Sequence, residues 1–190
     1  MRRLKSPAAD AWLRIALQGL IAALLACALA AVRAQGVELT TLRTQRAEGA
    51  LTLDYHARLT LTPAIEDALR RGVPLYFVAQ AAVYRNRWYW RDERVGRVTR
   101  NWRLSYQPLT DSWRLSLGAL SQSYPTLAEA LAPLARVSGW RLTDADRLEP
   151  GERYYLEFNF HIDKGQLPQP MQIDLGNDWK LGIERSQRIE

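Results

Sequence analysis

Most of the chain beyond its first 34 residues alternates apolar with polar side chains, the pattern of a strand with one buried face. The clearest run covers residues 51–61, where every second position is apolar. Residues 37–46 are its predicted partner, because Glu48-Gly49 between the two runs provides a glycine for the positive φ of a tight hairpin. We therefore expect an antiparallel strand pair at the start of the domain.

Other segments predict the remaining strands. Residues 75–84 form an almost continuous apolar run rich in β-branched and aromatic side chains, which favours a central strand. Residues 107–112 combine proline with short polar side chains, which favours a hairpin loop. Alternation predicts further strands at residues 87–91, 96–107, 112–118, 154–162 and 171–175.

Two short helices interrupt this pattern. Thr62-Pro63 supplies a capping residue and a proline for the first helical position, which predicts a helix over residues 63–71. Thr126 and Glu129 have the spacing of a capping box and begin a second helix with an apolar stripe. Because strands dominate, the sequence predicts a mainly β fold, either an antiparallel β-sandwich or a strongly curved sheet, with two inserted helices.

The first 34 residues predict export from the cytosol. Basic residues precede an uncharged run at positions 15–32, and small Val32 and Ala34 favour cleavage after Ala34. Two alternatives stay open: the run is just long enough to remain as a membrane anchor, and Leu24-Leu25-Ala26-Cys27 resembles a lipobox. We expect a signal peptide or N-terminal membrane anchor at residues 1–34. One β-rich domain at residues 35–190 then lies in the periplasm or on the periplasmic face of the inner membrane.

Composition narrows the chemistry of this exported part. Cys27 is the only cysteine, so residues 35–190 form neither an internal disulfide nor a thiolate metal site. The leader accounts for +4 of the formal net charge of +6, which leaves only +2 for the exported part. The basic balance of the whole chain therefore does not indicate nucleic acid as a partner.

The only two histidines suggest one catalytic or metal-binding alternative. His56 follows Asp54 by two positions, and Asp163 follows His161 by two, so each pair would share one strand face. If the two strands were neighbours, these residues could bind a metal ion, as in an envelope hydrolase or metal-binding protein. Solvated surface residues are the simpler interpretation, and recognised catalytic motifs do not occur in the sequence. We therefore expect a non-enzyme without cofactor, metal or catalytic residues.

Arginine and aromatic side chains are interleaved in residues 84–103. Guanidinium groups bind phosphates and carboxylates, and they stack on aromatic faces. In an exported protein this mixture favours anionic lipid head groups or an acidic envelope or inner-membrane protein over nucleic acid. The alternative is structural, with Asp92 and Glu93 as local partners for the arginines. The leading hypothesis is a non-catalytic binding or accessory module whose partner surface comprises Arg85, Arg87, Trp88, Trp90, Arg91, Arg94, Arg97 and Trp102.

Three stretches follow one another in a specific order and spacing. They are Leu-Ser-Tyr-Gln-Pro-Leu-Thr at residues 104–110, Ser-Tyr-Pro-Thr-Leu-Ala-Glu-Ala-Leu at 123–131 and Leu-Pro-Gln-Pro-Met-Gln at 167–172. Together they resemble a proteobacterial exported family, domain-of-unknown-function family 4390, over residues 38–183. The resemblance implies a cell-envelope location and a gene neighbourhood shared with a membrane sensor kinase of the nitrogen-regulation type. It implies no activity, and the family's usual second tryptophan after Trp179 is missing here.

Overall fold

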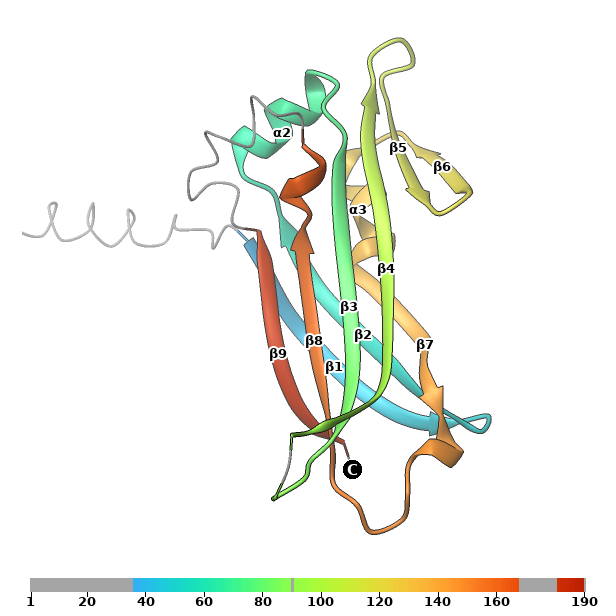
Figure 1. Ribbon diagram of the computed structural model, residues 1–190. Coiled ribbons are helices and arrows are strands. Elements are labelled where there is room, and N and C mark those ends of the chain that lie inside the picture. The colour runs from blue at the N-terminus through green and yellow to red at the C-terminus, as the bar shows by residue number, and fades with distance from the viewer. Residues whose placement is uncertain (1–35, 90, 168–180, 190) are drawn as a thin grey trace, which may run out of the picture. The chain divides into compact units, whose positions relative to one another are not determined.

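The computed structural model describes residues 36–89, 91–167 and 181–189 (Figure 1). All of them belong to the second of two compact units, Gln35–Glu190. They form a three-stranded and a six-stranded antiparallel sheet, which share one hydrophobic core. The predicted mainly β, sandwich-like fold is therefore confirmed. The leader with Cys27, Trp90, the double-proline segment, the predicted strand at 171–175 and Trp179 lie outside the described residues.

The three-stranded sheet has the order β1-β2-β7, with β1 at Gly36–Ala47, β2 at Ala50–Thr60 and β7 at Arg136–Asp144. Glu48 and Gly49 form the predicted β1–β2 turn with φ values of 51° and 70°. Two positive φ values match the right-handed twist of the flanking strands. The turn thereby fixes the register that places Leu51 and Leu53 in the core.

The six-stranded sheet has the order β6-β5-β4-β3-β8-β9. Its strands are β3 (Leu75–Arg85), β4 (Glu93–Gln107), β5 (Ser112–Leu117), β6 (Leu120–Tyr124), β8 (Tyr154–Ile162) and β9 (Gly182–Ile189). The predicted central strand is β3, which pairs with β4 on one side and β8 on the other. The predicted loop at 107–112 joins β4 to β5.

Both predicted helices are confirmed. Helix α2 covers Pro63–Arg70, and the Thr62 side chain accepts a hydrogen bond from the Ile65 N–H at its start. Helix α3 covers Leu127–Ala135, where Thr126 Oγ1 accepts from the Glu129 N–H at 3.2 Å. Short 3₁₀ turns occur at Ala145–Arg147 and Lys164–Gln166. No described helix is long and apolar enough to span a lipid bilayer.

The core lies between the two sheets. Tyr55 of β2 meets Phe158 of β8 with ring centroids 4.8 Å apart, so the inner faces of the sheets are in direct contact. The Tyr55 hydroxyl donates to the Leu134 carbonyl oxygen of α3 at 3.0 Å. At the margin the sheets approach so closely that a Cβ on Gly96 would lie 2.9 Å from the Leu142 carbonyl oxygen. Glycine is therefore required at this position of β4.

The sequence did not predict three of the described strands, β6, β7 and β9, and the strand that it predicted at residues 87–91 is wrong. Residues 87–89 and 91 belong to the connection between β3 and β4 rather than to a strand. Strand β6 has four exposed positions, so it carries no apolar period. In β7, Gly139 at φ 62° and two register shifts against β2 break the alternation. Strand β9 is exposed at most positions, which removes the same signal.

Candidate functional site

The arginine- and tryptophan-rich segment is the tip of the β3–β4 hairpin. We call residues 85–97 the hairpin tip; β3 ends at Arg85 and β4 starts at Glu93. Figure 1 shows this hairpin and the connection after β7 at the end of the sandwich opposite α2. Because these residues are nearly consecutive, the hairpin brings most of the predicted surface residues together at one end of the domain.

Carboxylates hold the first two arginines of the hairpin tip. Arg85 bonds Glu93 Oε2 through Nη2 at 2.5 Å and Glu149 Oε2 through Nη1 at 2.8 Å, and its side chain is only 15% exposed. Arg87 also pairs with Glu93. Hydrogen bonding to Arg85 lowers the pKa of Glu93, and the bond to Glu93 raises the pKa of Arg85. Both arginines are thus held by carboxylates of the domain itself, and Glu93 is one of the local partners that the structural alternative named.

Asp92 fastens the connection to the outer face of the six-stranded sheet. Its carboxylate accepts from the Tyr155 hydroxyl at 2.7 Å and from the Arg87 N–H at 3.1 Å. Both bonds favour the ionised form and lower the pKa of Asp92. Burial, followed by the bond to Asp92, raises the pKa of Tyr155, whose ring stacks on Tyr84 at 5.3 Å. Asp92 therefore links the connection to β8 and to the backbone of Arg87.

Two aromatic side chains project from this braced tip. Trp88 is 92% exposed and Tyr89 is 68% exposed. Their rings meet edge to face with centroids 5.2 Å apart and an interplanar angle of 75°. A tryptophan that buries almost none of its apolar surface adds little to the stability of its own domain. Exposed aromatic pairs of this kind are typical of binding surfaces.

The remaining arginines of the hairpin tip face solvent. Arg91 and Arg94 are exposed, and neither forms an ion pair within the described ranges. Arg97 is exposed and donates to Gln80 Oε1 at 2.5 Å. Arg94 also lines a hollow of about 320 Å³ together with Arg147 from the connection after β7. The tip thus combines two available guanidinium groups with the exposed Trp88–Tyr89 pair.

Trp102 does not belong to this surface. It is 2% exposed and lies opposite Phe77 in the core, because it occupies an inward position of β4. Its alternation with Leu104 already indicated an inner face. Conversely, the sequence did not indicate Tyr155, which binds Asp92 from 63 positions away, or Glu149, which pairs with Arg85 from 64 positions away. Tyr155 reaches the tip because β8 pairs with β3, and Glu149 comes from the connection between β7 and β8.

The structure separates the two histidines. His56 lies on β2 of the three-stranded sheet and His161 on β8 of the six-stranded sheet. Asp54 accepts from the Gly139 N–H at 2.6 Å, and Asp163 accepts from the Gly165 N–H at 3.0 Å. In the described part of the chain, no three His, Cys, Asp or Glu side chains are arranged to hold a metal ion. The neighbouring strands that the metal-site alternative required are not formed.

Fold and tip together define a two-sheet β domain with an exposed aromatic and basic hairpin. The chain belongs to the family described as domain of unknown function DUF4390, whose model matches residues 34–189. The resemblance found in the sequence is thus confirmed. Neither a curated protein nor a solved structure matches the chain.

Proposed function

We propose that the protein is a non-catalytic binding module of the cell envelope, and that its hairpin tip binds an anionic lipid surface outside the cytosol. The Trp88–Tyr89 pair at 92% and 68% exposure carries this proposal. Tryptophan and tyrosine partition to the membrane interface, where an apolar ring and a polar edge both find suitable surroundings. The predicted leader supports the location, since it would direct the domain to this compartment.

The arginines supply the charge that such a surface requires. Arg91 and Arg94 have no carboxylate partner among the described residues, so each can bind a lipid phosphate without breaking an existing ion pair. A basic side chain near an anionic membrane contributes about 1 kcal/mol. An acidic protein would meet the same charges, but the nearly complete exposure of Trp88 favours an apolar interface. In the envelope, a membrane sensor kinase system is the physiological setting we propose for this module.

Vesicle co-sedimentation tests the proposal with the purified protein. Vesicles of phosphatidylglycerol and phosphatidylethanolamine are expected to bind it, and vesicles of phosphatidylcholine are expected to bind it far less. Replacing Arg91 and Arg94 together by Ala should weaken binding roughly 30-fold, at about 1 kcal/mol for each arginine. Trp88→Ala with Tyr89→Ala should also weaken binding, while both double variants keep the stability of the parent, because exposed substitutions change it little.

Two matched controls lie away from the tip. Leu109, fully exposed in the β4–β5 loop, is changed to Ser, and the exposed Arg103 and Arg114 are changed together to Ala. These variants should bind vesicles like the parent. Equal binding by the tip variants and the controls would reject the hairpin tip as the contact. Tip-dependent binding of polyglutamate without binding to anionic vesicles would instead identify an acidic protein as the partner.

A further inference from the structure

A close contact between the two sheets brings the start of β4 beside the connection that follows β7. A Cβ on Gly96 would lie 2.9 Å from the Leu142 carbonyl oxygen and 3.0 Å from the Thr143 Cβ. Arg94 comes two residues before this contact on β4, and Arg147 comes four residues after Thr143, at the end of a 3₁₀ turn. Both arginines line one hollow of about 320 Å³, which we call the arginine hollow.

A β-bulge shapes the β4 side of the arginine hollow. The register between β3 and β4 shifts next to Gly96, which leaves Val95 without an opposite residue on β3. A bulge changes the direction of the side chains beside it, and bulges are over-represented next to functional sites. Both Arg94 and Val95 line the hollow. The placement of Arg94 therefore follows from an irregularity of the backbone at this point of the strand.

The arginine hollow has more basic than acidic charge available to a ligand. Its two carboxylates, Glu93 and Glu149, are both bonded to Arg85, at 2.5 and 2.8 Å. Arg94 and Arg147 are exposed, and neither forms an ion pair with another residue that the structure describes. Two guanidinium groups from different elements therefore line the same hollow without a carboxylate bonded to either.

The acidic residues next to Arg147 in the sequence do not line the hollow. Asp144 accepts from Arg141 Nη2 at 2.5 Å, and this bond, more than the charge of Arg147, lowers the pKa of Asp144. Asp146 is exposed on the 3₁₀ turn. Neither carboxylate is among the side chains that line the hollow, so Arg147 stays available to a ligand there.

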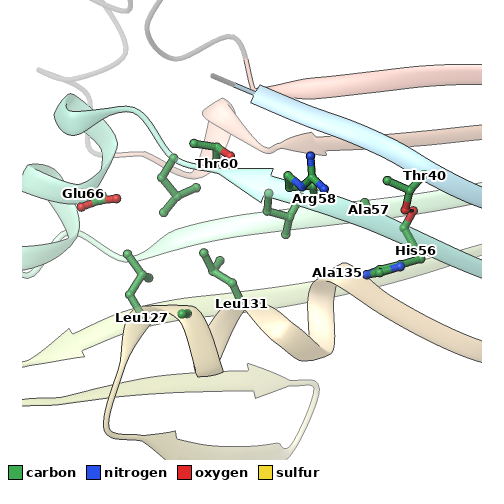
Figure 2. Close-up of a pocket in the computed structure, with 12 residues that line it drawn as sticks. Thr40, His56, Ala57, Arg58, Thr60, Glu66, Leu127, Leu131 and Ala135 are labelled. Carbon is green, nitrogen blue, oxygen red and sulfur yellow. Dashed lines mark hydrogen bonds between the residues drawn. The ribbon is translucent and has the colours of Figure 1, made fainter. Parts of the chain in front are cut away.

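Available positive charge distinguishes this hollow from the larger groove, of about 520 Å³, that β2 forms with α3. Leu127 and Leu131 of α3 point toward β2 across that groove (Figure 2). The arginine of the groove, Arg58, is paired with Glu38 at 3.1 Å, and the Glu66 side chain lines the same groove. An anion is therefore expected to bind in the arginine hollow and not in the groove.

We propose that the arginine hollow binds a phosphomonoester group, which Arg94 and Arg147 hold together. A phosphomonoester has a charge of about −1.5 to −2 at pH 7 and three acceptor oxygens, so it matches two cations. It can accept hydrogen bonds from both guanidinium groups at once, whereas the two oxygens of a carboxylate are already occupied by one arginine in a bidentate pair. A phosphodiester has only one negative charge and matches the hollow less well.

The same phosphate chemistry occurs in a lipid head group, as in phosphatidic acid, and in soluble glycerol or sugar phosphates. The lipid is the source that we favour, because the hairpin tip supplies Arg94 to the hollow and also presents the exposed Trp88–Tyr89 pair. This choice of source rests on the proposed function of the hairpin tip. The phosphate site itself does not, since it depends on Arg147 from a different part of the chain.

Co-sedimentation of the purified protein with vesicles of equal surface potential tests the lipid arm. Phosphatidylcholine vesicles contain either phosphatidic acid or enough phosphatidylglycerol to give the same zeta potential. The parent should bind the phosphatidic acid vesicles about fivefold more tightly, the factor that corresponds to one basic group at an anionic surface. Arg147→Ala should remove this preference. Arg91→Ala should weaken binding to both kinds of vesicle by the same factor, and Arg136→Ala, exposed at the other end of β7, should behave like the parent.

Soluble glycerol 3-phosphate provides the second arm, measured from the arginine Nε–H signals by NMR. It should shift the signals of Arg94 and Arg147 and leave that of Arg136 in place. Shifts without binding to any vesicle would support the hollow with a soluble ligand and reject the membrane role of the hairpin tip. The proposal would be overturned if glycerol 3-phosphate shifted neither signal and Arg147→Ala left the relative binding to the two kinds of vesicle unchanged. Tip-dependent binding to anionic vesicles would in that case still support the membrane role.

Discussion

Single side chains connect the layers of this domain, and Tyr55 is the clearest example. Its ring packs on Phe158 of the opposite sheet, and its hydroxyl reaches the Leu134 carbonyl oxygen of α3. Tyr55 is 2% exposed, so the hydroxyl has no access to water as an alternative partner. One residue therefore ties the two sheets and a helix together.

Replacing Tyr55 by Phe should destabilise the protein by about 1–3 kcal/mol at neutral pH, because the Leu134 carbonyl loses its buried partner. Urea unfolding at pH 7 measures this difference. Tyr55→Leu serves as a comparison that also removes the ring contact with Phe158, and it should cost more. Equal stability of Tyr55→Phe and the parent would show that the hydrogen bond contributes nothing.

The same side chain makes stability depend on alkaline pH. Burial, partly opposed by Arg100, raises the pKa of Tyr55 well above its ordinary value near 10. Below pH 10 the hydroxyl is neutral in both the folded and unfolded states, so the full stability is present. Above pH 10 the unfolded state ionises first, and stability falls with pH until the folded-state pKa is reached. Urea unfolding from pH 9 to pH 11.5 should show a smaller loss for Tyr55→Phe than for the parent.

Residue type alone did not reveal which tryptophans are exposed. Trp88 and Trp102 stand in the same arginine-rich stretch, yet one is 92% exposed and the other 2% exposed. The difference follows from register, since Trp102 alternates with Leu104 inside β4 and Trp88 lies in the connection before that strand. Predicting residues 87–91 as a strand concealed this distinction.

At the level of elements, local chemistry explains what the sequence predicted. Thr62-Pro63, Thr126 and Glu48-Gly49 act through neighbouring backbone groups and mark two helix starts and a turn as expected. In the capping box, the Glu129 carboxylate accepts from the Thr126 hydroxyl. The strands that were missed depend on distant partners. Strand β6 is held by pairing with β5, and β9 by pairing with β8, although neither has an apolar period of its own.

The capping box at the start of α3 provides a prediction at this scale. Thr126→Ala removes the acceptor for the Glu129 N–H and should cost about 1 kcal/mol, whereas Thr126→Ser retains the hydroxyl and should cost much less. Thermal unfolding of the two variants measures the difference. If both variants lost the same stability, the threonine methyl group rather than the cap would be responsible.

For the whole molecule, the fold places the hairpin tip and the groove that β2 forms with α3 on different parts of the sandwich. The hairpin tip lies at the end opposite α2, whereas Glu66 of α2 lines the groove beside β2 (Figure 1). The sequence indicated most residues of the tip, because they are consecutive. It gave no signal for the groove, which exists because β7 stops opposite His56 while β2 continues. Such a mismatch between paired strands becomes visible only in three dimensions.

The outer strands have a consequence for how the protein behaves at high concentration. Strand β6 is short, and β1 and β9 carry arginines and glutamates along their lengths, which are features that discourage stacking of further chains. We therefore expect concentrated samples to resist fibre growth from these three strands.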